Sequence, residues 1–227
     1  MLIKVTDAWN SEYPSAHLGV LAMRNVKNPR HHGELEALKR DFEKSIRTRY
    51  CDYTKRDLAA LPNMVCYQKY YKRFRKTYHV LLQLRSVVLE NKDLPSVAAL
   101  VEASFLAELN NGLLTAAHDL DKVRAPILLD IARDDDVYTL LSGRTQTLKA
   151  TDMVMRDAGG VICSVIYGLD NRTAITSTTR RALFVVYAPD GIATDDIRAH
   201  LEEIRRYAQI VAPQSETIEL NIYGNSR

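Results

Sequence analysis

The polar residues that could carry out chemistry gather in two short stretches of an otherwise apolar half of the chain. The first is His118-Asp119-Leu120-Asp121, which follows an apolar segment from Ser96 to Asn110. A histidine with a carboxylate is the pair expected of a general base and its orienting partner. Asp119 is equally suited to capping a turn, because neighbours in sequence seldom hydrogen bond through their side chains. His118 is therefore a candidate catalytic residue, and both interpretations of Asp119 stay open.

The second stretch is the polar loop Gly168-Leu-Asp-Asn-Arg-Thr173, which follows an apolar strand pattern. A loop in this position can present Asp170 and Arg172 to a ligand. Asp134-Asp135-Asp136 reads as a solvated turn, because the alternating spacing of oxygen ligands is missing. Cys163 lies in an apolar segment without a base nearby in sequence, which favours an inert buried thiol. We expect no metal and no cofactor.

Several enzyme classes find no support in the sequence. The chain contains no glycine-rich dinucleotide or phosphate loop, no Gly-x-Ser-x-Gly and no His-Glu-x-x-His motif. Its three cysteines are far apart and form no Cys-x-x-Cys pair, which is typical of a reducing compartment. The N-terminal apolar run is too short for a signal peptide, and no apolar run reaches membrane-spanning length. We therefore expect a cytoplasmic protein without membrane contact, of unspecified oligomeric state.

The pattern of apolar residues predicts the elements that hold these groups. Helices are expected over 33–50, 64–90 and 96–110, with a polar elbow at 115–121. Short alternating runs separated by Gly, Asn and Asp then predict a series of strands. Overall we expect an α+β fold in which a mixed or antiparallel sheet is flanked by helices. The 227 residues are expected to form one domain, with a basic helical part at 24–90 and a strand–helix–strand end at 181–223.

Charge is distributed unevenly along the chain. Residues 24–85 hold sixteen Lys and Arg against six Asp and Glu, a net +10, which leaves −7 for the rest of the +3 chain. Such asymmetry is compatible with a polyanion on one face, or with solvated helix faces alone. An aromatic stripe of Tyr67, Tyr71, Phe74 and Tyr78, continued by Leu82, is predicted to pack inward. The bases off the stripe are predicted to contact an RNA backbone: Lys69, Lys72, Arg73 and Lys76.

The order of motifs from Pro95 to Tyr187 resembles the editing domain of the phenylalanyl-tRNA synthetase beta subunit, the B3/B4 module. The resemblance is strongest over 95–188, and no single motif in it is diagnostic. Seven motifs recur in order and spacing: Ala99–Glu102, Ala116–Val123, Leu128–Arg133, Val137–Arg144, Thr147–Asp157, Ser164–Gly168 and Ile175–Thr179.

This resemblance implies helices around a mixed sheet, and a pocket that in the synthetase hydrolyses tyrosine wrongly attached to tRNA. The family's threonine falls at Ser104, which keeps a hydroxyl, and its histidine falls at Ala116, which removes that group. His118 lies two residues away. The family's glycine falls at Asp157, and its glutamate falls at Asp170. Asp170 is thus the second candidate catalytic residue and also a candidate substrate contact. The candidate substrate-binding set is Ser104, Ala116, Asp157, Tyr167, Asp170 and Arg172.

The resemblance implies a free-standing deacylase that clears a mischarged aminoacyl-tRNA, with aminoacylated tRNA as the partner. Two alternatives stay open. One is a binding module that holds a small amino acid or amine in the same pocket without catalysis, and the other is a plain RNA-binding protein. Full synthetase activity is not implied, because the ATP-binding catalytic domain is missing from these 227 residues.

Overall fold

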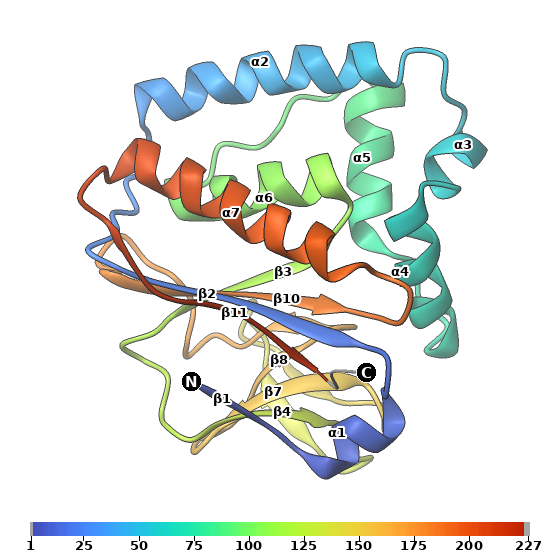
Figure 1. The fold of residues 1–227 in the computed structure, drawn as a ribbon, viewed down its shortest axis with the longest axis vertical. Coiled ribbons are helices and arrows are strands. Elements are labelled where there is room, and N and C mark those ends of the chain that lie inside the picture. Colours follow the sequence, from blue (N-terminus) through green and yellow to red (C-terminus); the bar gives the residue numbers. More distant parts are fainter. Residues whose placement is uncertain (1, 225–227) are drawn as a thin grey trace.

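A computed structural model describes residues 2–224, which form seven helices and eleven strands and confirm the α+β class (Figure 1). The helices are α1 Asp7–Glu12, α2 Gly33–Arg49, α3 Lys55–Ala59, α4 Pro62–Arg73, α5 His79–Leu89, α6 Ala99–Asn111 and α7 Thr194–Val211. The strands are β1 Ile3–Val5, β2 His17–Arg24, β3 Thr115–Asp119, β4 Ile127–Ile131, β5 Val137–Thr139, β6 Thr145–Thr147, β7 Met153–Asp157, β8 Gly160–Ser164, β9 Gly168–Leu169, β10 Arg181–Ala188 and β11 Glu216–Gly224.

The strands form two large sheets and one hairpin. An antiparallel sheet has the order β11-β2-β10-β3. The second sheet has the order β1-β4-β7-β8-β9, and it is mixed because β1 runs parallel to β4 while the other pairs are antiparallel. β5 and β6 form a separate two-stranded hairpin. The expected mixed or antiparallel pairing is therefore confirmed, and it is divided between two large sheets where one was expected.

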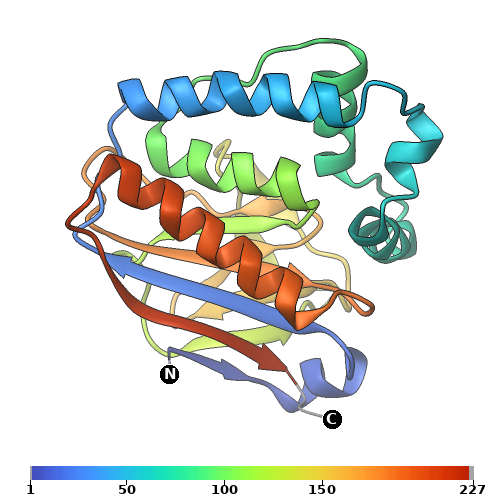
Figure 2. The same ribbon diagram turned by 45° about the horizontal axis from the view of Figure 1, so that its top comes forward.

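Helices cover one face of the four-stranded sheet, and the five-stranded sheet lies on its other side (Figure 1). α6 and α7 lie side by side over the strands, and α2 crosses above them (Figure 2). α7 approaches β2 so closely that a Cβ on Gly19 would overlap the Ile197 side chain, which explains a glycine inside a buried strand. No helix within residues 2–224 is long and apolar enough to cross a membrane.

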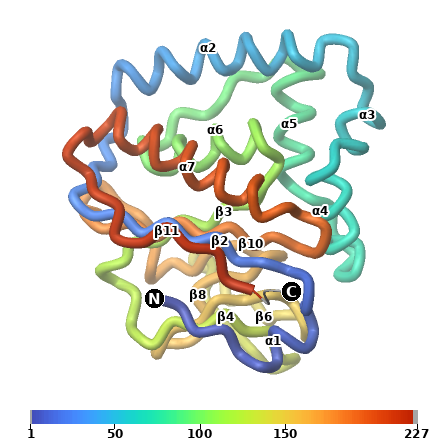
Figure 3. The backbone as a smooth tube through the Cα atoms, in the orientation of Figure 1, coloured from blue at the N-terminus to red at the C-terminus, as the bar shows by residue number. Residues whose placement is uncertain are grey.

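Both ends of the described chain lie in the lower half of Figure 3, on the side away from α2. The backbone N–H of Leu2 donates to Glu219 Oε2 at 3.0 Å, so that β11 reaches from the four-stranded sheet to the edge of the five-stranded one. The predicted polar elbow at 115–121 is wrong for its first five residues. They form the edge strand β3, because their backbone pairs with Ala182–Val186 of β10.

The single helix expected over 64–90 is wrong, because α4 and α5 are separated by a turn at 74–78. Arg75 in this turn has a φ of 58°. In one straight helix, Tyr67 and Tyr78 would lie about 16 Å apart along the axis. Their rings instead stack with centroids 4.4 Å apart. The turn brings Tyr78, the residue before α5, onto Tyr67 of α4, so that two tyrosines of the stripe share one buried core. Leu82, expected in the stripe, is 46% exposed.

Tyrosine hydroxyls from this helical part hydrogen bond the backbone of both sheets. Tyr67 Oη donates to the carbonyl of Tyr187 at 2.6 Å and accepts from the N–H of Leu114 at 3.0 Å. Tyr71 Oη donates to the carbonyl of Val165 at 2.8 Å. Both rings are fully or almost fully buried, so the stripe is core as predicted. These hydroxyls fix α4 to the ends of three separate segments.

Replacing Tyr67 with Phe should remove both bonds of its hydroxyl and leave a buried N–H and a buried carbonyl without a partner. We expect the free energy of unfolding to fall by about 1–3 kcal/mol. Urea denaturation of this variant and of Tyr53→Phe, the same change at an exposed tyrosine, measures the difference in the free energy of unfolding. Equal stability of the two variants would contradict the importance of the Tyr67 bonds.

Candidate functional site

A cavity of about 610 Å³ opens where α6, β3, the β8–β9 segment and the β5–β6 hairpin meet. Its apolar wall comprises Leu114, Ala116, Leu140, Leu141, Val165, Leu169 and the backbone of Gly168. Its polar groups come from His79, Glu108, Thr115, Ser142, Arg144, Cys163, Ser164, Tyr167 and Tyr187. A mostly apolar hollow with a few convergent polar groups is the usual form of a small-molecule site.

Glu108 supplies the only carboxyl group in the cavity wall that the structure describes. It lies in the last turn of α6, and its side chain is buried. One carboxyl oxygen accepts a 2.7 Å hydrogen bond from the backbone N–H of Thr115. Burial raises the Glu108 pKa to about 8, although the Thr115 hydrogen bond acts to lower it. The carboxyl is therefore mostly protonated near neutral pH when the cavity holds no cation.

Thr115 is held from both sides. Its N–H is bound by Glu108, and its hydroxyl lies 2.7 Å from Nε2 of His200 on α7. Burial lowers the pKa of His200 to about 3, so this imidazole is neutral. The Nδ2 of Asn111 lies 3.2 Å from the other ring nitrogen. The start of β3 is thus fixed to α7 where it borders the cavity.

Ser164 and Tyr187 lie on the sheet side of the cavity. Ser164 Oγ donates a short hydrogen bond to Asp152 and accepts from the N–H of Tyr167 at 3.1 Å. Burial raises the Asp152 pKa to about 6. The Tyr187 hydroxyl is buried and lies beside the Cys163 thiol, and no oxygen or nitrogen atom of residues 2–224 is within hydrogen-bond geometry of it. Burial raises the pKa of that thiol to about 12, in agreement with the inert cysteine predicted from the sequence.

Of the six substrate-binding residues predicted from the sequence, Ala116 and Tyr167 line the cavity. The hydroxyl of Ser104 donates to the carbonyl of Val101 at 2.9 Å inside its own helix. The lining excludes the other predicted residues: Ser104, Asp157, Asp170, Arg172 and the candidate base His118. Their role as substrate contacts stays a prediction.

Four of the residues outside the cavity lining form a separate network that includes the loop 168–173. They are His118, Asp157, Asp170 and Arg172. Arg172 donates to both carboxyl oxygens of Asp157, at 2.9 and 2.7 Å, and its Nε lies 3.7 Å from Asp170 Oδ2. Thr173 Oγ1 bonds Asp170 and lies 2.7 Å from His118 Nδ1. Burial lowers the pKa of His118 to about 3, so the ring is neutral, and its Nε2 has no hydrogen-bond partner among the described residues. Both carboxylates of the network thus have Arg172 as a cationic partner, and these contacts hold the loop that carries Leu169.

The predicted RNA contacts lie on α4 and just beyond it. Lys69, Lys72, Arg73 and Lys76 are all exposed. Lys69, Lys72 and Arg73 border an open groove of about 700 Å³ with Ala59, Val65 and Gln68. Lys76 Nζ lies 5.2 Å from the centre of the Tyr167 ring, within range of a cation–π interaction, so the basic surface reaches the cavity wall. Arg73 instead pairs with Glu12.

Sequence reasoning missed Glu108, and the only signal available was an acidic residue in an apolar helix. That signal also marks Glu102, six residues earlier. Glu102 is buried as well, but it pairs with the equally buried Lys39 at 3.1 Å. Both glutamates lie in the same apolar helix, so the pattern of the sequence could not separate the paired acid from the unpaired one. No group of three or more His, Cys, Asp and Glu in the described part of the chain is placed to hold a metal.

The raised pKa of Glu108 makes stability depend on pH. The folded state binds a proton more tightly than the unfolded state, so this carboxyl should cost stability as pH rises from about 4.5 to about 8 and add no further loss above that. Glu108→Gln should remove this loss, which is of the order of a few kcal/mol because one pKa unit is about 1.4 kcal/mol. Urea denaturation of both proteins at pH 5 and pH 8 provides the test, and parallel pH profiles would contradict it.

Comparison with known proteins places this architecture in a family. No curated protein matches the sequence. Among solved structures, an N-terminal fragment of the phenylalanyl-tRNA synthetase beta subunit from Pyrococcus horikoshii is similar, with a TM-score of 0.48 and 10% identity. The similarity covers 95% of this chain and 49% of that one, so the chain spans about half the length of the fragment. The family model for the B3/4 domain matches residues 65–215, well over half of the sequence. The chain therefore belongs to the B3/4 domain family, as its motif order predicted.

Proposed function

We propose that this protein binds the aminoacylated end of a tRNA and hydrolyses the ester of a wrongly attached amino acid. The observation that carries the proposal is the contact between Lys76 and Tyr167, which joins the basic surface at the end of α4 to the wall of a mostly apolar cavity. A polyanion that follows the lysines of α4 would deliver its end to that cavity. The family and the order of motifs shared with the synthetase editing module support tRNA as the polyanion.

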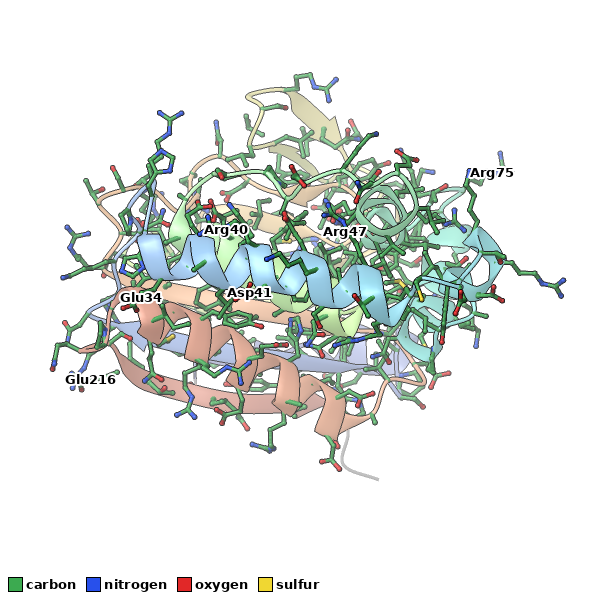
Figure 4. All side chains as sticks on the ribbon, turned by 90° about the horizontal axis from the view of Figure 1, so that it is seen from above. Glu34, Arg40, Asp41, Arg47, Arg75 and Glu216 are labelled. Carbon is green, nitrogen blue, oxygen red and sulfur yellow. The ribbon has the colours of Figure 1, made fainter. Side chains whose placement is uncertain are left out.

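The basic residues differ in whether an ion pair within the protein already occupies the charged group. Lys72 and Lys76 make no ion pair with the described residues, and Lys69 has only a loose 3.9 Å contact with Asp190. Arg75, which was not among the predicted contacts, lies at the same end of the molecule as α4 (Figure 4). We propose that Lys69, Lys72 and Lys76 contact the RNA backbone, while Arg73 serves mainly to hold α4 to Glu12.

The reaction requires water, the aminoacyl ester and groups that position them. Water adds to the ester carbonyl, the bond to the ribose oxygen breaks, and the products are the free amino acid and the terminal hydroxyl of the RNA. The hydroxyls of Thr115 and Ser164 are held by His200 and Asp152, so both are fixed before a substrate enters. Holding the reactants in place is the source of rate enhancement in such a site. In this arrangement Asp170 and His118 act as positioning residues through the loop 168–173.

A second candidate function is binding of an amino acid or amine without hydrolysis. The observation that favours it is Ala116, which lines the cavity where the resemblance implies a histidine that anchors the substrate. Without that side chain the wall keeps its shape but loses one polar contact. The two functions use the same cavity and differ in whether the ester is cleaved.

Deacylation of a panel of mischarged tRNAs by the purified protein separates these functions. We expect at least one ester to be cleaved above the spontaneous rate, and Ala116→Leu, which fills part of the cavity, to reduce that rate by about tenfold or more. Ala37→Leu, at an exposed position of α2, is the matched control. Cleavage of no ester, combined with binding of a free amino acid, would favour the second candidate. Cleavage that Ala116→Leu leaves unchanged would place the reaction outside the cavity.

The RNA contacts have their own prediction. Combined replacement of Lys69, Lys72 and Lys76 by Ala should weaken tRNA binding and lower the slope of log affinity against log salt by about 2–3, since each lost phosphate contact removes about 0.7–0.9. Filter binding across a salt series measures the slope. A triple variant at the exposed Lys27, Lys44 and Lys92 should keep the wild-type slope. Equal slopes for both triple variants would contradict the assignment of α4.

A further inference from the structure

Glu108 is the most unusual ionisable group of the cavity, because it is buried and has no cation. Its side chain is 6% exposed, and a single 2.7 Å hydrogen bond from Thr115 N–H is its one partner among the hydrogen bonds and ion pairs of the described residues. Transfer of a carboxylate out of water without a counter-ion is costly. The same helix shows the usual solution at Glu102, which has Lys39. A buried carboxyl without a cationic partner in a cavity wall is suited to bind a ligand that carries a positive charge.

The surroundings of Glu108 offer no substitute cation. From α4 and the start of α5, the hydroxyls of Tyr67 and Tyr71 are bonded to backbone carbonyls, and that of Tyr78 donates to Gly112 O at 3.2 Å. His79 also lines the cavity, and its Nδ1 lies 3.3 Å from the Tyr71 hydroxyl. Across the cavity Arg144 is exposed on the β5–β6 hairpin. Neither of these two bases forms an ion pair with Glu108 in the part of the chain described.

We propose that Glu108 is the receptor for a protonated primary amine, so that the cavity selects ligands with a free amino group and rejects those whose amine is blocked. The placement of an aminoacyl group in this cavity rests on the function proposed above, whereas the recognition of an ammonium group rests on Glu108 itself. The apolar wall of Leu114, Val165 and Leu169 would hold the remainder of the ligand. The ligand class is therefore primary amines with an apolar substituent, and esters of apolar amino acids are one such group.

Burial of the carboxyl supports this assignment. Because the pKa of Glu108 is raised to about 8 by desolvation, the empty site is mostly protonated at pH 7. A bound ammonium would stabilise the carboxylate and lower that pKa again. Binding of an amine at pH 7 should then release close to one proton, with a small offset from the amine's own titration.

Leucinamide and N-acetyl-leucinamide share the side chain and the carboxamide, whereas acetylation adds an acetyl group and leaves no amine that can be protonated. We expect the wild-type protein to bind leucinamide at least about tenfold more tightly, which corresponds to about 1.4 kcal/mol. Glu108→Gln keeps the shape and the acceptor for Thr115 N–H, and it should abolish the preference. Glu34→Gln, at the exposed start of α2 (Figure 4), should keep it. Calorimetry in two buffers of different ionisation enthalpy gives both the affinity and the proton release.

Equal affinity for the two probes, failure to bind leucinamide at millimolar concentration, or binding without proton release would each overturn the proposal. The proton release of the wild-type protein does not depend on any variant folding. If leucinamide is preferred but no tRNA ester is cleaved, the ammonium receptor stands and the deacylase function fails. If esters are cleaved equally well with free and N-acetylated amines, the deacylase function stands and the ammonium receptor fails.

Discussion

The structure depends on buried tyrosine hydroxyls that bond the backbone of the cavity wall. Tyr67 holds Leu114 and Tyr187, and Tyr71 holds Val165, and each of these three partners lines the cavity. Since an unpaired buried carbonyl or N–H is costly, α4 cannot shift without breaking these bonds. The opposite face of the same helix carries Lys69 and Lys72. The basic surface and the cavity are therefore fixed in relation to one another by one helix.

Some charged groups of the molecule are paired with an opposite charge inside the protein, and others are not. The paired groups are structural, whereas the unpaired ones are available to a ligand. Arg172 pairs with both Asp157 and Asp170, and Lys39 pairs with both Glu36 and Glu102. Each of these carboxylates therefore has a cationic partner within the protein. Glu108 inside the cavity lacks a counter-charge, and the lysines of α4 face solvent. An amine inside and phosphates outside would complement both, and an aminoacylated RNA end combines these groups.

Sequence patterns predicted the elements well wherever one face of an element is buried. The apolar residues of α7 that recur at helical spacing, namely Ile197, Leu201, Ile204 and Ala208, are fully buried. β2, β4 and β10 coincide with short apolar runs of the sequence. The turn between α4 and α5 was missed, because local periodicity continues across it and only the stacking of Tyr67 on Tyr78 requires it. The site was harder to predict. Motif order locates residues along the chain, but strand register and neighbouring elements decide that Ala116 borders the cavity while His118 meets Thr173.

The most direct test is a crystal structure of the protein with a non-hydrolysable adenosine that carries a leucyl group through an amide at its 3′ position. We expect the leucyl group in the cavity, its ammonium within hydrogen-bond distance of Glu108, and the adenosine directed toward Lys76. An ammonium bound instead by Asp157 or Asp170, or an analogue seated outside the cavity, would contradict it.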